Sequence, residues 1–203
     1  MILLTSYYTD DSEDRQRELD LCLQLNLANL TFRAIILFVD GFCKIQHPTL
    51  SHIPMRDRLT YQDAFNFANR FFVGEICVLA NSDIYFDESL KLIAEADLTN
   101  KFYAITRHNV ERDGSLSFSD CNACQDVWVF RAPLKPVVSL FGLGTPGCDN
   151  RIAYEAKTAG LIVLNPCQII RCHHLHLTNK RNYVQNQPVV PGPYERVEFG
   201  DQL

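Results

Sequence analysis

Three features are missing from this chain of 203 residues, and each absence removes a class of function. No apolar run approaches the ~18 residues of a membrane-spanning helix, so we expect no transmembrane segment. Lysine and arginine are scattered and the net charge is −5, so the basic stripe of a nucleic-acid-binding surface is absent. The opening residues MILLTSYYTDD have no basic region before the apolar one, so we expect no signal peptide.

Eight cysteines without a secretory signal predict reduced thiols and a cytoplasmic location. Cys22 and Cys77 lie inside apolar patterns, where a cysteine acts as a small hydrophobe. Cys121 and Cys124 form a CxxC pair, but the sequence offers neither two further zinc ligands nor a thioredoxin-like strand–helix context. We therefore interpret this pair as two loop thiols.

Short apolar runs alternate with stretches of helical periodicity, which predicts an α/β fold with a mainly parallel central sheet flanked by helices. We expect strands at 2–4, 34–39, 76–80, 102–106, 127–130, 161–164 and 169–172, and helices at 12–30, 60–72, 88–96 and 149–159. Residues 42–57 and 108–124 are predicted loops. A single Rossmann-like domain would span residues 1–183, and 184–203 would be a Pro/Gln-rich tail or a linker to further domains.

Polar residues follow several predicted strands, at the edge where α/β sheets bind ligands. The buried strand 76–80 ends in Asn81, Ser82 and Asp83, and a carboxylate there suits a divalent cation bound to a diphosphate. These three residues are also good turn formers, which is the simpler interpretation. Further candidate nucleotide contacts are Thr5, Ser6 and Tyr7 after the first strand, Asp40 after the second, and Arg58 and Thr60 before a helix.

The order of the motifs resembles that of nucleotide-sugar glycosyltransferases of the GT-A fold. The motifs are Asn81-Ser82-Asp83, Gln125-Asp126, Gly147-Cys148-Asp149 and His174-Leu175-His176. More narrowly, residues 1–183 are similar to the small amino-terminal glycosyltransferase domain of a chlorella-virus multidomain enzyme and its bacterial relatives. The family's metal motif is usually Asp-x-Asp, whereas Asn81 occupies its first position here.

The resemblance implies a UDP-sugar donor, a glycan or other hydroxyl acceptor, and Mn²⁺ or Mg²⁺ as cofactor. Asp83 would hold the metal with His174 or His176, which share one face if they lie on a strand. An inverting transfer needs a general base, for which Asp149 is the first candidate and Asp126 the second. Asp149 could instead be a helix N-cap, and the histidines could be ordinary partly buried side chains.

Two other functions remain open. A nucleotidyltransferase would show a glycine-rich loop with a basic residue after the first strand, whereas this chain has Thr5-Ser6-Tyr7-Tyr8. A degenerate domain that only binds a nucleotide sugar is favoured by Asn81 in place of an aspartate.

Overall fold

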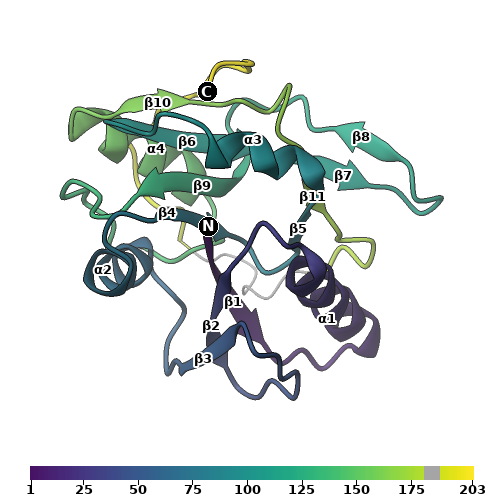
Figure 1. The fold of residues 1–203 in the computed structure, drawn as a ribbon. Helices are drawn as coiled ribbons and strands as arrows, with labels where there is room; N and C mark the ends of the chain where they lie inside the picture. Colours follow the sequence, from purple (N-terminus) through teal and green to yellow (C-terminus); the bar gives the residue numbers. More distant parts are fainter. Residues whose placement is uncertain (181–187) are drawn as a thin grey trace.

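The computed structural model describes residues 1–180 and 188–203 and contains two β-sheets and four α-helices within that part of the chain (Figure 1). The strands of the larger sheet are β1 (Ile2–Tyr8), β2 (Ala34–Asp40), β3 (Leu50–Pro54), β4 (Ile76–Ala80), β6 (Lys101–Thr106), β9 (Gln125–Arg131) and β10 (Ile162–Leu164). The helices are α1 (Glu13–Ala28), α2 (Tyr61–Phe71), α3 (Lys91–Ala94), which follows a 3₁₀ turn (Glu88–Leu90), and α4 (Cys148–Thr158).

The larger sheet has the order β10-β6-β9-β4-β1-β2-β3. Only β9 runs against its neighbours among these strands; the other adjacent pairs are parallel. The prediction of an α/β fold with a mainly parallel central sheet flanked by helices is therefore confirmed. The strand β3 falls in the predicted loop 42–57, where His47-Pro48 and Ile53-Pro54 hide it from a pattern search.

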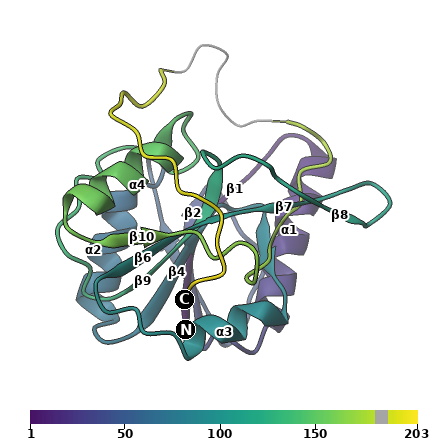
Figure 2. The ribbon, with the colours of Figure 1, turned by 90° about the horizontal axis from the view of Figure 1, so that it is seen from above.

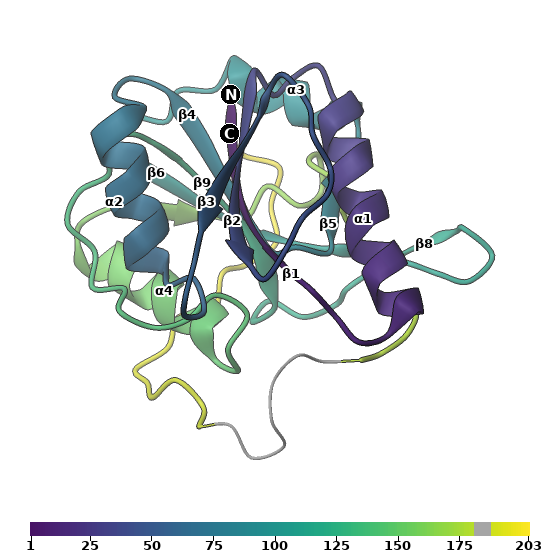
Figure 3. The same ribbon diagram turned by 90° about the horizontal axis from the view of Figure 1, so that it is seen from below.

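Apolar side chains fill a layer on each face of this sheet. Because side chains alternate along a strand, Ile2 and Leu4 of β1 pack with α2 and α4, while Leu3 and Tyr7 pack with α1. Figure 3 shows α2 and α4 on one side of the sheet and α1 on the other. All five residues of β4 are buried, so polar side chains can enter this layer only where the strand ends.

The smaller sheet was not predicted. Its strands are β5 (Ile84–Phe86), β7 (His108–Val110), β8 (Leu116–Phe118) and β11 (Cys172–His174), in the order β5-β11-β7-β8. The predicted loop 108–124 thus contains a hairpin that extends away from the body (Figures 1 and 2), and the predicted strand 169–172 is shifted to 172–174. In β11, His174 pairs with Ile84, so this sheet brings a histidine next to Asp83.

Residues 188–203, here called the C-terminal segment, run back over α4 and β10 (Figure 2). Val190 and Val197 are buried in the layer beneath α4, and the Val197 amide donates to the Asn122 carbonyl at 3.0 Å. Part of the predicted tail is therefore packed against the core. The predicted boundary between residues 183 and 184 lies outside the described residues, and the division into a domain and a tail stays a prediction.

Six cysteines are free and buried, as Cys22 and Cys77 were expected to be. Cys121 and Cys124 form a disulfide, which corrects the prediction of two loop thiols. Within residues 1–180 and 188–203, no helix combines the length and the apolar character that crossing a membrane requires.

Candidate active site

A cleft of about 220 Å³ lies where β1 and β4 end, between the glycine-rich turn before α4 and the segment after β11. Its lining contains most of the predicted site residues: Ser6, Arg58, Asn81, Ser82, Asp83, Asp126, Asp149, His174 and His176. The structure thus brings together side chains that lie far apart in the sequence. The roles assigned to them stay predictions.

Asp83 and the two histidines form a cluster of metal-ligating atoms. Asp83 Oδ2 lies 3.4 Å from His174 Nε2 and 3.5 Å from His176 Nδ1, and one ligand atom from each of the three residues lies within 4.8 Å of the others. The second nitrogen of each ring faces an oxygen: His174 Nδ1 is 3.2 Å from Asn109 Oδ1, and His176 Nε2 is 2.6 Å from the Lys180 carbonyl oxygen.

These two oxygens orient the histidine rings. A carbonyl oxygen only accepts hydrogen bonds, so the ring nitrogen that faces it donates one, and the other ring nitrogen is directed toward Asp83. One oxygen and two imidazole ligands suit Mn²⁺, so the donor set fits a divalent cation.

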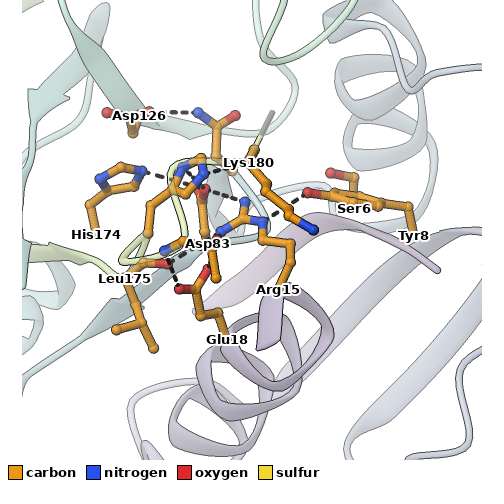
Figure 4. Close-up of polar contacts among 12 residues, drawn as sticks. Ser6, Tyr8, Arg15, Glu18, Asp83, Asp126, His174, Leu175 and Lys180 are labelled. Carbon is orange, nitrogen blue, oxygen red and sulfur yellow. Dashed lines mark hydrogen bonds and ion pairs between the residues drawn. The ribbon is translucent and has the colours of Figure 1, made fainter. Parts of the chain in front are cut away.

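Arg15 of α1 contacts the same carboxylate. Its guanidinium points at the Asp83 carboxylate (Figure 4). Arg15 Nη2 lies 2.7 Å from Asp83 Oδ2, and the two side chains are 3% and 10% exposed. Burial alone would raise the pKa of Asp83, but the hydrogen bond and charge of His174, together with Arg15, outweigh it and hold this pKa well below its usual range. Asp83 is therefore an anion over the whole physiological pH range.

Both carboxylate oxygens of Asp126 accept hydrogen bonds. Oδ1 accepts a hydrogen bond from Asn81 Nδ2 at 2.6 Å, and Oδ2 pairs with Arg107 Nη1 at 2.7 Å. A carboxylate that accepts two hydrogen bonds, one of them from a charged arginine, orients both donors. Asn81 therefore holds Asp126, and Asp126 is the weaker candidate for a base because both of its oxygens already accept hydrogen bonds.

Asp149 lies in the first turn of α4, and the N-cap of this helix is Gly147 with φ +81°. The alternative interpretation of Asp149 as an N-cap is therefore wrong. Its carboxylate borders the cleft and accepts a hydrogen bond from Cys148 Sγ at 3.0 Å. Burial, and then the charge of Asp126, raise the pKa of Asp149 well above the usual carboxyl range, although the Cys148 hydrogen bond and Arg107 oppose them. Raised carboxyl pKa values are typical of groups that transfer protons.

The remaining predicted residues lie beside the cleft or away from it. Tyr7 and Asp40 line a neighbouring pocket of about 60 Å³, which shares Ser6 and Arg58 with the cleft. Thr5 is buried in β1, and the Thr60 hydroxyl accepts from the Asp63 amide in the capping box of α2. Thr5 and Thr60 are thus outside the described linings of both pockets.

Sequence reasoning missed five polar side chains of the cleft, namely Tyr8, Arg15, Arg107, Thr145 and Lys180. The position of Tyr8 could have been predicted from the alternation of side chains along a strand. The strand β1 extends to residue 8 and places Tyr8 on the same face as Ser6. Arg107 directly follows β6, which is parallel to β4, so the rule that singled out Asp83 would also have found it. Arg15 gave no signal, because a polar residue in the first turn of a helix is expected to face solvent.

The fold matches that of a solved structure, the mannosyltransferase PcManGT from Pyrobaculum calidifontis in complex with GDP-Man and Mn²⁺. The TM-score is 0.59 at 14% identity, over 90% of this chain and 58% of that one, so this chain spans little more than half the length of PcManGT. HddC from Yersinia pseudotuberculosis has a TM-score of 0.43 at 12% identity, over 64% of this chain and 76% of its own. The galactosyltransferase LgtC has a TM-score of 0.38 at 9% identity, over 64% of this chain and 58% of its own.

No protein-family model matches the sequence, and no curated protein matches it either. The narrower resemblance to the chlorella-virus domain stays a prediction. At 14% identity the likeness to PcManGT shows the fold alone, and the weaker likenesses add nothing to it. The chain has the GT-A type of fold, which it shares with a mannosyltransferase.

Proposed function

We propose that this protein is a metal-dependent glycosyltransferase that moves a sugar from a nucleoside-diphosphate sugar to a hydroxyl group of a glycan or another acceptor. One observation carries the proposal. The cluster of Asp83, His174 and His176 shares a cleft with Asp149, a partly buried carboxyl group of raised pKa. UDP-sugars are the first donors to test, and GDP-sugars are the second because PcManGT was solved with GDP-Man.

The cleft offers separate groups for the parts of such a donor. Mn²⁺ or Mg²⁺ held by Asp83, His174 and His176 would withdraw negative charge from the leaving diphosphate. Arg58 and Lys180 line the same cleft and add positive charge for the phosphates. The neighbouring pocket, which is lined by Asp40 among others, would receive the base and ribose.

Asp149 has the properties of the base in a single displacement. The acceptor oxygen forms a bond to the anomeric carbon while the bond from that carbon to the phosphate oxygen breaks, and the hydroxyl proton passes to the Asp149 carboxylate. This reaction inverts the anomeric centre. A base works best when its pKa lies near the working pH, and the environment of Asp149 moves its pKa in that direction. Asp126 keeps Arg107 and Asn81 in place beside it.

The other two functions have less support. After β1 the chain continues with Thr9-Asp10-Asp11-Ser12, an acidic turn that would repel the phosphates of a nucleotidyltransferase substrate. The candidate metal cluster has three possible ligands without Asn81, because two histidines accompany Asp83. The substitution of Asn81 for an aspartate therefore gives weak grounds for a degenerate domain.

Calorimetry with UDP and GDP, in Mn²⁺ and in EDTA, tests the metal bridge. Binding should be much tighter with Mn²⁺, because the diphosphate otherwise faces Asp83 without a cation between them. Asp83→Asn should remove the Mn²⁺-dependent gain, whereas Asp97→Asn, at an exposed aspartate, should keep it. Equal affinity of the wild type in Mn²⁺ and EDTA would refute the proposal, and release of nucleoside diphosphate from a panel of sugar donors identifies the donor.

A further inference from the structure

The segment that carries the second histidine lies beyond regular structure. β11 ends at His174, so sheet hydrogen bonds do not position His176. Other contacts hold the segment between residues 175 and 178, and three of its hydrogen bonds come from side chains of α1. The Leu175 amide donates to the Asp83 carbonyl oxygen at 2.9 Å, which ties the histidine segment directly to the carboxylate residue.

Arg15 joins Asp83 to this segment. Its Nη2 contacts Asp83 Oδ2 at 2.7 Å, and its Nη1 donates to the Leu175 carbonyl oxygen at 3.4 Å. Leu175 is the residue between the two histidines. One guanidinium group therefore contacts both the Asp83 carboxylate and the backbone between His174 and His176. Tyr8 Oη accepts from Arg15 Nε at 3.2 Å and fixes the plane of the guanidinium (Figure 4).

Glu18 holds the end of the same segment. Its Oε1 accepts from the Thr178 amide at 2.8 Å, and its Oε2 accepts from the Thr178 hydroxyl at 2.9 Å. Oε2 also pairs with Arg15 Nη1 at 2.9 Å, so the two side chains form one network one turn apart on α1. Both are buried, and a buried ion pair is maintained only where its hydrogen bonds are well satisfied.

We infer that Arg15 and Glu18 are a positioning pair for the divalent-cation site, an inference that rests on the proposed function. The pair holds Asp83 and the 175–178 segment at a fixed separation, and so presets the three ligands before any cation binds. Arg15 also balances the charge of Asp83 in the metal-free protein. The helix α1 therefore determines the metal affinity of the cleft, although it supplies no ligand.

Titration of Mn²⁺ into the nucleotide-free protein, followed by electron paramagnetic resonance of the free ion, measures this affinity without any activity assay. Glu18→Ala should weaken Mn²⁺ binding by ~10–100-fold, the usual effect of removing a group that orients metal ligands. Arg15→Lys should weaken it by a similar factor, because an ammonium group keeps the charge but loses the planar fork that reaches all its partners. Thr178→Val, which keeps the backbone amide bond to Glu18, should have a smaller effect in the same direction.

The matched control lies on the same helix. Glu13 and Arg17 also form an ion pair, but their side chains are 87% and 70% exposed, so Glu13→Ala should leave Mn²⁺ affinity unchanged.

If the wild type and Glu18→Ala bind Mn²⁺ equally, the positioning role is refuted while the metal site stands. If Arg15→Lys binds Mn²⁺ more tightly, Arg15 is a competitor for Asp83 and the inference fails. If the wild type binds no Mn²⁺, the proposed function loses its metal and the inference falls with it. Should Glu18→Ala not fold, Thr178→Val decides, and unchanged affinity in that variant counts against the inference.

Discussion

Asp149 and Asp126 should respond in opposite ways when each is changed to asparagine. Asp149→Asn removes a charge that the folded protein disfavours, because burial and Asp126 raise the pKa of Asp149. The asparagine oxygen still accepts from Cys148, so the melting temperature should stay equal or rise. Transfer should fall by ~10²–10⁴-fold, the usual contribution of a general base.

Asp126→Asn should have a clear stability effect. The asparagine amide turns a donor toward Arg107 and loses the 2.7 Å ion pair, a charge-assisted hydrogen bond that contributes about 1.5–3 kcal/mol. For a protein of this size, each kcal/mol lowers the melting temperature by roughly 2–4 °C, so a decrease of about 3–12 °C is expected. Transfer should fall less than in Asp149→Asn, because Asp126 only orients its neighbours.

The pH dependence of the unfolding free energy tests the raised pKa of Asp149 separately from its role in transfer. Between the ordinary carboxyl pKa near ~4 of the unfolded chain and the raised pKa of Asp149, the folded state holds more protons than the unfolded state. The unfolding free energy of the wild type therefore falls as pH rises through this interval, and Asp149→Asn lacks this loss. Its stability advantage should grow with pH in thermal unfolding followed by circular dichroism. If Asp149→Asn transfers normally and Asp126→Asn does not, Asp126 is the base and this interpretation of the cleft is wrong.

Three further outcomes are expected. The transfer rate should increase as pH rises above the ordinary carboxyl range, because Asp149 must lose its proton to act as a base, and a rate independent of pH there would contradict this. Deleting the C-terminal segment should lower the melting temperature by several degrees, since burial of Val190 and Val197 contributes about 1.5–3 kcal/mol each; an unchanged melting curve would show that the contact is not stabilising. Gly147→Ala should destabilise more than Gly160→Ala: both glycines have positive φ, but only at Gly147 does an added Cβ approach the C-terminal segment, at 2.9 Å.

Local pattern in the sequence was sufficient to predict the parts of the fold that depend on local physics. The strand 76–80 was located to the residue because five apolar residues end in three polar ones. The helix 60–72 was found from its apolar face and from the capping box of Thr60 and Asp63, which the structure contains. Both faces of the sheet are buried, so such apolar segments have few other stable arrangements.

What the sequence could not predict depends on contacts between distant segments. The smaller sheet exists because β11 pairs with β5 and β7, and none of its strands has a strong pattern of its own. Arg15 is buried through its contacts with Asp83 and Leu175. These partners lie 68 and 160 residues away along the chain, so no local pattern indicates them. The disulfide and the packing of the C-terminal segment likewise become evident only when the chain is folded.

The two outer strands of the larger sheet affect how this protein would meet other copies of itself. An unpaired edge strand is a template on which another chain can add a strand and begin to aggregate. On the β10 side, the C-terminal segment occupies this place: Asn165 and Phe199 form a parallel bridge, and the Gly200 amide donates to the Asn165 carbonyl at 2.9 Å. On the other side, β3 ends in Pro54, which has no amide hydrogen to offer. Strand addition is therefore hindered at both edges, so a chain that loses its last residues should also become more prone to self-association.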